Sequence, residues 1–364
     1  MTVDYNRRMA SSKCFKFMQI LFLWKGSIYK IAWFELIFFG SLYAIISLIY
    51  RFVLYGKYKE NFEIFCIFCD SIDNYIPVAF IMGFYVTMIA RRWWKQFYNI
   101  PWPDNVALLV NAYISGSDRR TVMIRRNIIR YINLSLILFL RSISPQTKKI
   151  IKEEEDLISY ELFNSEEFKL FDKVSSSFNR YFIPILWSVN LVKKMFLEGR
   201  IKTEIRARNL IIEIIHYREK LNKLFCYDWV NPPLVYTQTA TISVYIYFLT
   251  SLFSKQFLDP IKRYPNRHFD YYVPVFSIAQ LFFYFGWLKV AEALINPFGE
   301  DDDDFDSIGL INRNLTSFFF FIRSKESLFP KIIKDKKWNE SLPLKIDDFI
   351  IDPKFFSDTL PKID

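Results

Sequence analysis

Four stretches of the chain are long and apolar enough to cross a membrane. They lie at about 31–54, 72–90, 229–253 and 271–295, and few charged residues interrupt them. An apolar helix of about 20 residues matches the thickness of the hydrocarbon layer of a bilayer. Tryptophans lie near the ends of these stretches, as in the aromatic belts of membrane proteins. The pattern therefore predicts an integral membrane protein with four transmembrane helices.

The stretch of about 130 residues between the second and third spans is too long for a loop without structure of its own. Its pattern predicts helices over 119–141 and 166–171 and a long amphipathic run over 181–225. Its apolar segments are short or interrupted, which favours a large helical cytosolic region next to the membrane over further spans. The predicted fold class is therefore all-α throughout.

These patterns divide the chain into six parts. They are an N-terminal cytosolic segment (1–30), the first two spans (31–99), a cytosolic helical region (100–228), the last two spans (229–295), an acidic segment with the helix after it (296–324) and a C-terminal tail (325–364). Basic residues precede the first span and follow the second, whereas the 55–70 connection carries little net positive charge. Because Lys and Arg accumulate on the cytoplasmic side, both termini are expected in the cytoplasm. The basic 254–270 loop then lies outside, which argues mildly against this orientation.

The composition agrees with a membrane protein. The chain is 52% hydrophobic and 19% aromatic, with 39 Phe and 22 Tyr, which a soluble protein would have difficulty covering. The net charge is +10, but the basic residues are spread along the chain and flank apolar runs, so the expected partner is a lipid membrane and not nucleic acid. The polar, basic residues 1–16 indicate no cleavable signal peptide. We expect a multi-pass protein, in the plasma membrane.

No arrangement typical of a catalytic site stands out. Histidine occurs only at His216 and His268, which the predicted topology places on opposite sides of the membrane. No two of the nine glycines are spaced as Gly-x-Gly, so nucleotide-binding glycine loops are missing. The four cysteines are too scattered for a disulfide framework. The chain is not expected to be an enzyme.

An acidic segment directly follows the fourth span. Its six carboxylates lie within seven positions: Glu300, Asp301, Asp302, Asp303, Asp304 and Asp306. Ca²⁺ takes six to eight oxygen ligands and would relieve the repulsion between them, although the spacing is not that of an EF-hand. A solvated acidic loop, or carboxylates that favour the N-terminus of the next helix, would explain the same residues. On these residues alone, both interpretations stay open.

The second span carries an aromatic stripe. Ile76, Phe80 and Phe84 are spaced i, i+4, i+8 and so predict one face of a helix. Pro77 leaves nearby backbone groups unpaired, which membrane proteins tolerate only against protein or a wet cavity. Such a stripe usually packs in a core. The alternative is a narrow apolar throat that gates an ion path by dewetting, with ring edges whose partial positive charge suits an anion.

Several short motifs are informative through their order and spacing. They are Trp24-Lys25-Gly26-Ser27-Ile28-Tyr29-Lys30, Gly83-Phe84-Tyr85-Val86-Thr87, Arg92-Trp93-Trp94, Pro101-Trp102-Pro103-Asp104, Tyr227-Asp228-Trp229, Pro233-Leu234-Val235-Tyr236-Thr237-Gln238, Gly286-Trp287-Leu288-Lys289-Val290-Ala291-Glu292 and Asn296-Pro297-Phe298-Gly299-Glu300-Asp301-Asp302-Asp303-Asp304-Phe305. Together they resemble the bestrophin family of calcium-activated anion channels, over about residues 1–350.

The resemblance implies a helical homopentamer around one central path for chloride and other monovalent anions. Ile76, Phe80 and Phe84 match the hydrophobic neck of the family, and Ile205 matches a second constriction, the cytosolic aperture. The expected function is a calcium-activated chloride channel that is gated at the neck.

The resemblance also assigns the acidic segment to a calcium clasp, which makes Ca²⁺ the expected cofactor. The implied ligands are the side chains of Asp301 and Asp304 and the backbone carbonyls of Ala10, Ala293 and Asn296. Glu300, Asp302 and Asp303 lie nearby. Position 293 is often glutamine in the family, but a main-chain ligand tolerates alanine.

One departure sets this chain apart from the family pattern. Ile150-Ile151-Lys152 stand where the Arg-Phe-Pro triplet of the family would fall, which predicts a changed turn or helix boundary there. A non-conducting calcium-binding scaffold that regulates other channels stays open as the alternative function. An anion transporter is disfavoured because no internal repeat is found. The sequence does not decide between chloride, bicarbonate and larger organic anions.

Overall fold

The structure is a computed structural model that describes residues 14–73, 75–176, 179–259, 262, 264, 273–323 and 333–334. The chain divides into two units, Met1–Ile322 and Arg323–Asp364. The helices belong to the first unit, apart from the last residue of the final helix. Over the described residues the regular elements are helices and no strand occurs, which confirms the predicted all-α fold.

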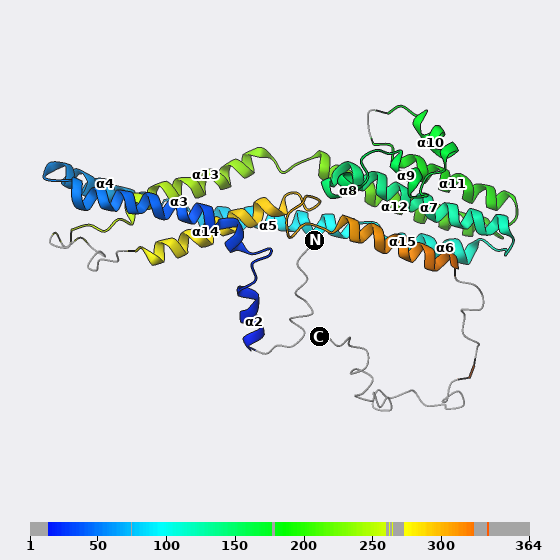
Figure 1. Ribbon diagram of the computed structural model, residues 1–364, viewed down its shortest axis with the longest axis horizontal. Helices are drawn as coiled ribbons and strands as arrows, with labels where there is room; N and C mark the ends of the chain where they lie inside the picture. The colour runs from blue at the N-terminus through cyan, green and yellow to red at the C-terminus, as the bar shows by residue number, and fades with distance from the viewer. Residues whose placement is uncertain are drawn as a thin grey trace. The chain divides into compact units, whose positions relative to one another are not determined.

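Five helices form one bundle. They are α3 (Ile28–Leu48), continued by the π-helix η1 (Ile49–Val53), α4 (Lys57–Asp73), α5 (Val78–Tyr98), α13 (Leu234–Ser254) and α14 (Val275–Leu294). Helix α13 packs against the other four, and α14 also packs against α3 and α5, so the helices lie side by side (Figure 1). Clusters of buried apolar side chains fill the contacts between them.

The first helix of the bundle is the clearest candidate for a membrane span. Among the described residues, Ile28–Val53 is the one helix that is long and apolar enough by length and composition, with a mean hydropathy of 1.9 over its most apolar window. Only 17% of that window is buried, and Trp33, Phe34, Ile37 and Phe38 are exposed. Exposed apolar surface of this extent marks contact with lipid or with another protein.

Proline divides the predicted second span, 72–90, so that prediction is wrong in its boundaries. Helix α4 ends at Asp73, and α5 begins directly after Pro77 and continues to Tyr98. Proline has no N–H to donate and disfavours the helical conformation of the residue before it. The residues expected to form a connection at 55–70 are mostly helix α4 instead.

The third and fourth predicted spans also begin later than expected. The predicted third span starts at 229, but Trp229 is the last residue of the preceding helix, and α13 starts only after Pro233. Helix α14 starts after Pro274. The apolar pattern thus finds the helices, whereas the prolines decide where they begin.

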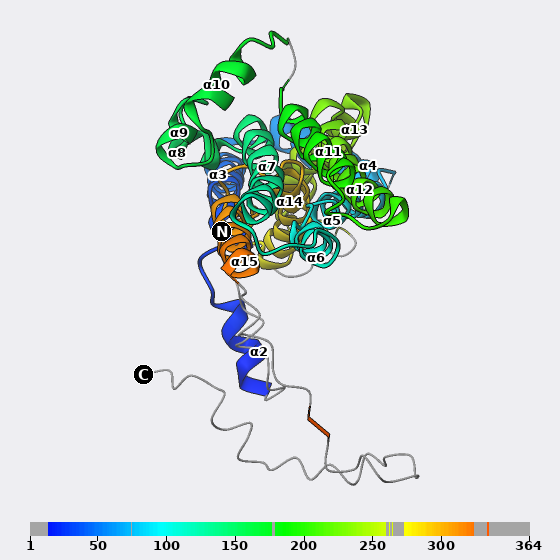
Figure 2. The same cartoon turned by 90° about the vertical axis from the view of Figure 1, so that its right-hand side faces the viewer.

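Helix α2 (Cys14–Leu21) precedes the bundle. Most of the remaining helices form a second layer around one central helix. They are α6 (Asp104–Tyr113), α7 (Arg119–Ile143), α8 (Pro145–Ile150), α9 (Asp156–Ser159), α10 (Ser165–Asp172), α11 (Phe182–Leu197), α12 (Glu204–Trp229) and α15 (Ser307–Arg323). Helix α7 contacts α6, α8, α11 and α12 (Figure 2). Its side chains are buried almost without interruption from Ile128 to Leu140. This apolar run therefore forms the core of the layer.

Two local features of this layer differ from the predicted pattern. The amphipathic run 181–225 is broken into α11 and α12, because Gly199 adopts a φ of +72° that ends the first helix. The segment that lacks the Arg-Phe-Pro triplet begins at Ile150, the last residue of α8. There Arg141 donates from Nε to the Ile151 carbonyl at 3.1 Å and from its terminal nitrogen to the Lys152 carbonyl at 2.6 Å.

Candidate ion path and calcium site

Helix α5 presents one face to the core of the bundle. Pro77 precedes its first turn, where a missing N–H leaves no intrahelical bond unmade. Val78, Met82, Tyr85 and Ile89 recur every three to four residues and are buried against α13 and α14. This packing fixes the rotation of the helix and therefore decides which side chains point away from the core.

The opposite face of α5 carries two uncovered phenylalanines. Phe80 is 66% exposed and Phe84 is 65% exposed, and their ring centroids lie 4.7 Å apart in an edge-to-face arrangement. Ile76 lies before the helix and is half-buried against the cluster that contains Val78. The predicted helical stripe thus holds for the phenylalanines. Ile76 departs from it because Pro77 prevents the helix from extending back to it.

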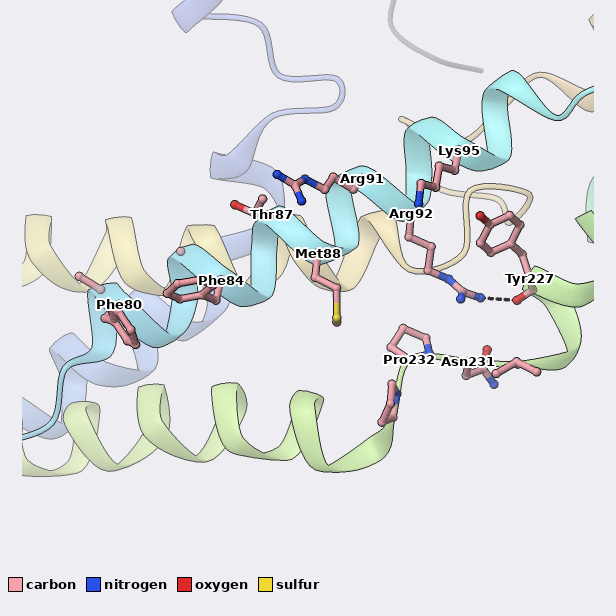
Figure 3. Close-up of a pocket in the computed structure, with 14 residues that line it drawn as sticks. Phe80, Phe84, Thr87, Met88, Arg91, Arg92, Lys95, Tyr227, Asn231 and Pro232 are labelled. Carbon is pink, nitrogen blue, oxygen red and sulfur yellow. Dashed lines mark hydrogen bonds between the residues drawn. The ribbon is translucent and has the colours of Figure 1, made fainter. Parts of the chain in front are cut away.

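A cavity of about 840 Å³ lies along this exposed face (Figure 3). Its lining comprises Phe80, Phe84, Thr87, Arg91, Arg92 and Lys95 of α5, among other residues of that helix, and the connection from α12 to α13. Arg92 donates to the backbone carbonyl of Tyr227 and stacks 5.1 Å from the centroid of its ring. This contact ties α5 to the end of α12.

Sequence reasoning missed the polar part of this face. Thr87, Arg91 and Lys95 follow Phe84 at i+3, i+7 and i+11 and so continue its stripe. The basic residues were interpreted only as a topology signal after the second span. Extending the helical spacing beyond Phe84 would have found all three.

The predicted aperture residue lies at the start of α12. The Thr203 hydroxyl caps this helix by accepting from the Arg206 backbone N–H at 3.4 Å. Ala207 and Leu210 face the core, whereas Ile205 is 70% exposed. Ile205 is therefore a large apolar side chain without cover in the subunit, like the two phenylalanines of α5.

The acidic segment forms a tight loop between α14 and α15. The Phe305 backbone N–H donates to the Pro297 carbonyl at 2.7 Å and closes the loop. Phe305 is only 6% exposed, and its ring centroid lies 4.9 Å from that of Trp93 and 5.5 Å from that of Phe97, both on α5. The loop is thus packed against the same helix that carries Phe80 and Phe84.

Some carboxylates of the loop are neutralised by lysines from other parts of the subunit. Asp302 accepts from the Lys30 ammonium at 2.5 Å and from the Gly26 backbone N–H at 3.1 Å. The Lys30 ammonium holds the pKa of Asp302 below its ordinary value. Glu300 forms an ion pair with Lys149 at 2.6 Å. These contacts join the loop to the start of α3 and to α8.

Three other carboxylates, those of Asp301, Asp303 and Asp304, have no cationic partner among the described residues. Asp304 is 2% exposed and accepts from the Asp301 backbone N–H at 2.7 Å, and burial raises the pKa of Asp304 to about 6. Burial, with the neighbouring Asp302 carboxylate, also raises the pKa of Asp303. The Asp301 carboxylate has no hydrogen bond or ion pair among the described residues. A buried carboxylate is costly when charged unless a cation or a donor compensates it.

The structure brings some of the predicted calcium ligands together and leaves others apart. A cavity of about 320 Å³ brings Ala293 of α14 together with Asp301 and Asp303 of the loop. Asp304 and Asn296 do not line this cavity, and the Asn296 carbonyl accepts from the Gly299 N–H at 3.3 Å. The described residues contain no cluster of three or more His, Cys, Asp or Glu side chains placed to hold a metal. The predicted ligand set does not require such a cluster, because it has only two side-chain ligands and takes the others from backbone carbonyls. Ala10, one of those carbonyl ligands, lies outside the described residues.

Solved structures of related proteins identify the class of fold. Two structures of a bacterial bestrophin homologue from Klebsiella pneumoniae each match 80% of this chain, with TM-scores of 0.61 and 0.58. The matches cover 100% and 98% of those chains at 16% and 15% sequence identity. At an identity this low the match shows a shared fold alone, that of the bacterial bestrophin homologue.

Sequence comparison then gives the family. A sequence model described as "Bestrophin, RFP-TM, chloride channel" matches residues 1–324. Bestrophin-3 from Homo sapiens is 43% identical over 341 residues, which cover 94% of this chain and 51% of that relative. Bestrophin homolog 2 from Caenorhabditis elegans is 33% identical over 347 residues, which cover 94% of this chain and 82% of that relative. The chain belongs to the bestrophin family.

The chain spans about half of Bestrophin-3 and 59% of the Homo sapiens Bestrophin-1 that it also matches. The family description is that of a channel and not of an enzyme, in agreement with the expectation from the sequence.

Proposed function

We propose that this chain is the subunit of a calcium-activated anion channel that passes chloride and other monovalent anions. The observation that carries the proposal is the exposed face of α5. Two phenylalanines lie uncovered there, and basic side chains follow on the same face of a helix whose other face is fully packed. In the proposed homopentamer, five copies of this face surround the central path.

The throat of this path is formed by Phe80 and Phe84, with Ile76 at its outer end. Stacked apolar rings exclude water when they are close together and so block ions without any plug. Ile205 provides a second apolar constriction at the cytosolic end. Neither constriction offers a group that reads one anion over another, so selection among anions rests on size and ease of dehydration.

The acidic loop regulates the throat through its contact with α5. A bound calcium ion would supply the positive charge that the Asp301 and Asp304 carboxylates require. Phe305 follows Asp304 directly and packs against Trp93 and Phe97, so a change in the loop reaches the helix that carries the throat. Calcium opens the path only if the loop binds it more tightly in the open state.

The proposal includes location and orientation. We place the channel in the plasma membrane with both termini in the cytoplasm, so that the acidic loop meets cytosolic calcium. The apolar surface of α3 supports contact with lipid.

Current from the purified protein in planar bilayers tests the proposal. A chloride gradient is applied, and free calcium is added to and removed from one face at a time. The expected result is a calcium-dependent current that reverses near the chloride equilibrium potential. A protein that is pentameric and binds calcium, yet carries no current in either condition, would instead be the non-conducting scaffold.

A further inference from the structure

Beyond Phe84, the exposed face of α5 changes from apolar to cationic. Thr87, Arg91 and Lys95 are spaced i, i+4, i+8 and are all exposed. With a rise of 1.5 Å per residue, Arg91 lies about 10 Å further along the helix axis than Phe84. Phe84 and Arg91 are seven residues apart, close to two turns, so they point in nearly the same direction. Whatever space the phenylalanines face, Arg91 faces it too.

The charges on this face are not neutralised within the described part of the subunit. Arg91 and Lys95 form no ion pair or side-chain hydrogen bond there. The adjacent Arg92 is different, because the Tyr227 carbonyl and ring hold it. The 840 Å³ cavity has three basic residues in its lining and no acidic one.

The Thr87 hydroxyl is a further donor on this face. Elsewhere in the bundle, helical hydroxyls donate to the carbonyl four residues earlier, as Thr239 does to Val235 at 2.7 Å and Ser243 to Thr239 at 2.7 Å. Thr87 makes no such bond in the described structure. In Figure 3 the side chain of Arg91 extends towards Thr87, one turn earlier on the helix. A hydroxyl and a guanidinium that share one direction can together donate to one small anion.

We propose that Thr87, Arg91 and Lys95 form an anion-binding site at the mouth of the throat. The ligand is a small monovalent anion, held by the Arg91 guanidinium and the Thr87 hydroxyl before it enters or after it leaves the apolar rings. Lys95 lies one turn further along α5, at the end away from Ile76, and raises the local anion concentration there. The inference rests on the proposed function, because only an assembled path brings the copies of this site around a common axis.

Single-channel conductance as a function of chloride concentration tests the site. In Arg91→Gln the conductance at low salt falls about threefold or more, because a cationic mouth concentrates counter-ions by factors of ten and above. At high salt the variant and the original protein converge, because screening removes the advantage. Arg91→Lys keeps most of the conductance. Lys169→Gln, which removes an exposed charge on α10, serves as the matched control and leaves the conductance unchanged.

Charge restoration guards against a variant that assembles poorly. Arg91→Cys channels are recorded before and after a cationic and an anionic thiol reagent, and the original protein receives the same reagents. The cationic reagent raises the low-salt conductance, and the anionic reagent lowers it or leaves it low. Equal low-salt conductance in Arg91→Gln and the original protein, or equal effects of the two reagents, overturns the site while leaving the channel in place. Absence of current from every form refutes the proposed function itself.

Discussion

Phe305 is the residue through which the acidic loop contacts the throat helix, and its truncation tests that coupling. Phe305→Ala removes a ring that is 6% exposed and lies 4.9 Å from Trp93 and 5.5 Å from Phe97 between centroids. Replacing a buried phenylalanine by alanine lowers the free energy of unfolding by about 3–5 kcal/mol. Each of the two aromatic pairs accounts for about 0.5–1.5 kcal/mol of this. The contact between loop and helix therefore holds about 1–3 kcal/mol that can couple calcium binding to α5.

A coupling free energy of this size corresponds to a change of about 5- to 150-fold in an equilibrium. Phe305→Ala is thus expected to raise the calcium concentration for half-maximal current by on the order of tenfold. Calcium titrations of macroscopic current from reconstituted protein measure this. Phe305→Leu, which keeps apolar volume without the ring contacts, should give an intermediate shift.

Loss of stability alone must be separated from loss of coupling. Phe171 on α10 is 0% exposed and packs in the helical layer, so Phe171→Ala destabilises the subunit by a similar amount. It should leave the calcium dependence unchanged. If Phe305→Ala and Phe171→Ala show the same calcium titration as the original protein, the loop does not act through Phe305 and the reasoning is refuted.

Three further predictions concern the throat, the loop and the helical layer. The triple variant in which alanine replaces Ile76, Phe80 and Phe84 should conduct without calcium, because no apolar ring remains to exclude water. A current that still needs calcium would argue against this throat as the gate. Asp304→Asn should lower the calcium affinity measured in a titration by at least about tenfold, since loss of an outer-shell partner alone lowers metal affinity by that factor. The Asp306 carboxylate instead accepts from the Gly309 N–H at 2.8 Å, so Asp306→Asn should bind calcium normally. Burial alone would raise the pKa of Glu167, but the hydrogen bonds from Arg130, at 2.6 Å, and Tyr131 outweigh it and hold this pKa below its ordinary value of 4.5. The ion pair of Glu167 with Arg130 therefore stabilises the fold fully above about pH 4.5 and loses this contribution as the pH falls through the lowered pKa of Glu167. Near neutral pH, Glu167→Gln should lower the free energy of unfolding measured with denaturant by about 3 kcal/mol. Glu198→Gln, in the more exposed ion pair with Arg120, should lower it by less than about 1 kcal/mol. Equal losses in the two variants would contradict the assignment.

The sequence predicted those features of the fold and site that depend on local spacing. The apolar stretches gave the bundle helices, and the i, i+4 pair of Phe80 and Phe84 gave an exposed aromatic face. Helical spacing counted on from Phe84 also places Arg91 on this face, but a basic residue that follows an apolar span is equally a signal of membrane topology. Pro77 was recognised as a disturbance of the second span, yet not as the point where a new helix begins.

The contacts that connect the site could not be predicted in this way. Phe305 and Trp93 are far apart in the chain, and no periodicity relates an aromatic residue in a loop to one on a distant helix. The ion pair between Lys30 and Asp302 is equally non-local. A run of carboxylates indicates that positive charge is required. Only the packed structure decides which carboxylate meets a lysine and which, like Asp304, is buried without one among the described residues.

In the proposed channel, Gly83 is the position at which we expect α5 to deform on opening. It lies between the two exposed phenylalanines, and a Cβ added there would meet nothing within 4 Å in the subunit, so close packing does not require a glycine. Glycine inside a helix costs about 1 kcal/mol relative to alanine, which makes this turn the weakest of α5. Since Val78, Met82, Tyr85 and Ile89 hold the other face, bending at one weak turn disturbs less packing than moving the whole helix.

Gly83→Ala should therefore favour the straight, closed helix and reduce the open probability at saturating calcium by about fivefold, the equivalent of 1 kcal/mol. Gly40 on α3 also has nothing within 4 Å of an added Cβ, so Gly40→Ala strengthens a helix equally without touching the throat. Single-channel recordings of both variants decide the matter. An equal effect of the two substitutions would mean that helix stability in general limits opening. An effect confined to Gly83→Ala would locate the deformation between Phe80 and Phe84, where the aromatic rings must separate for an anion to pass.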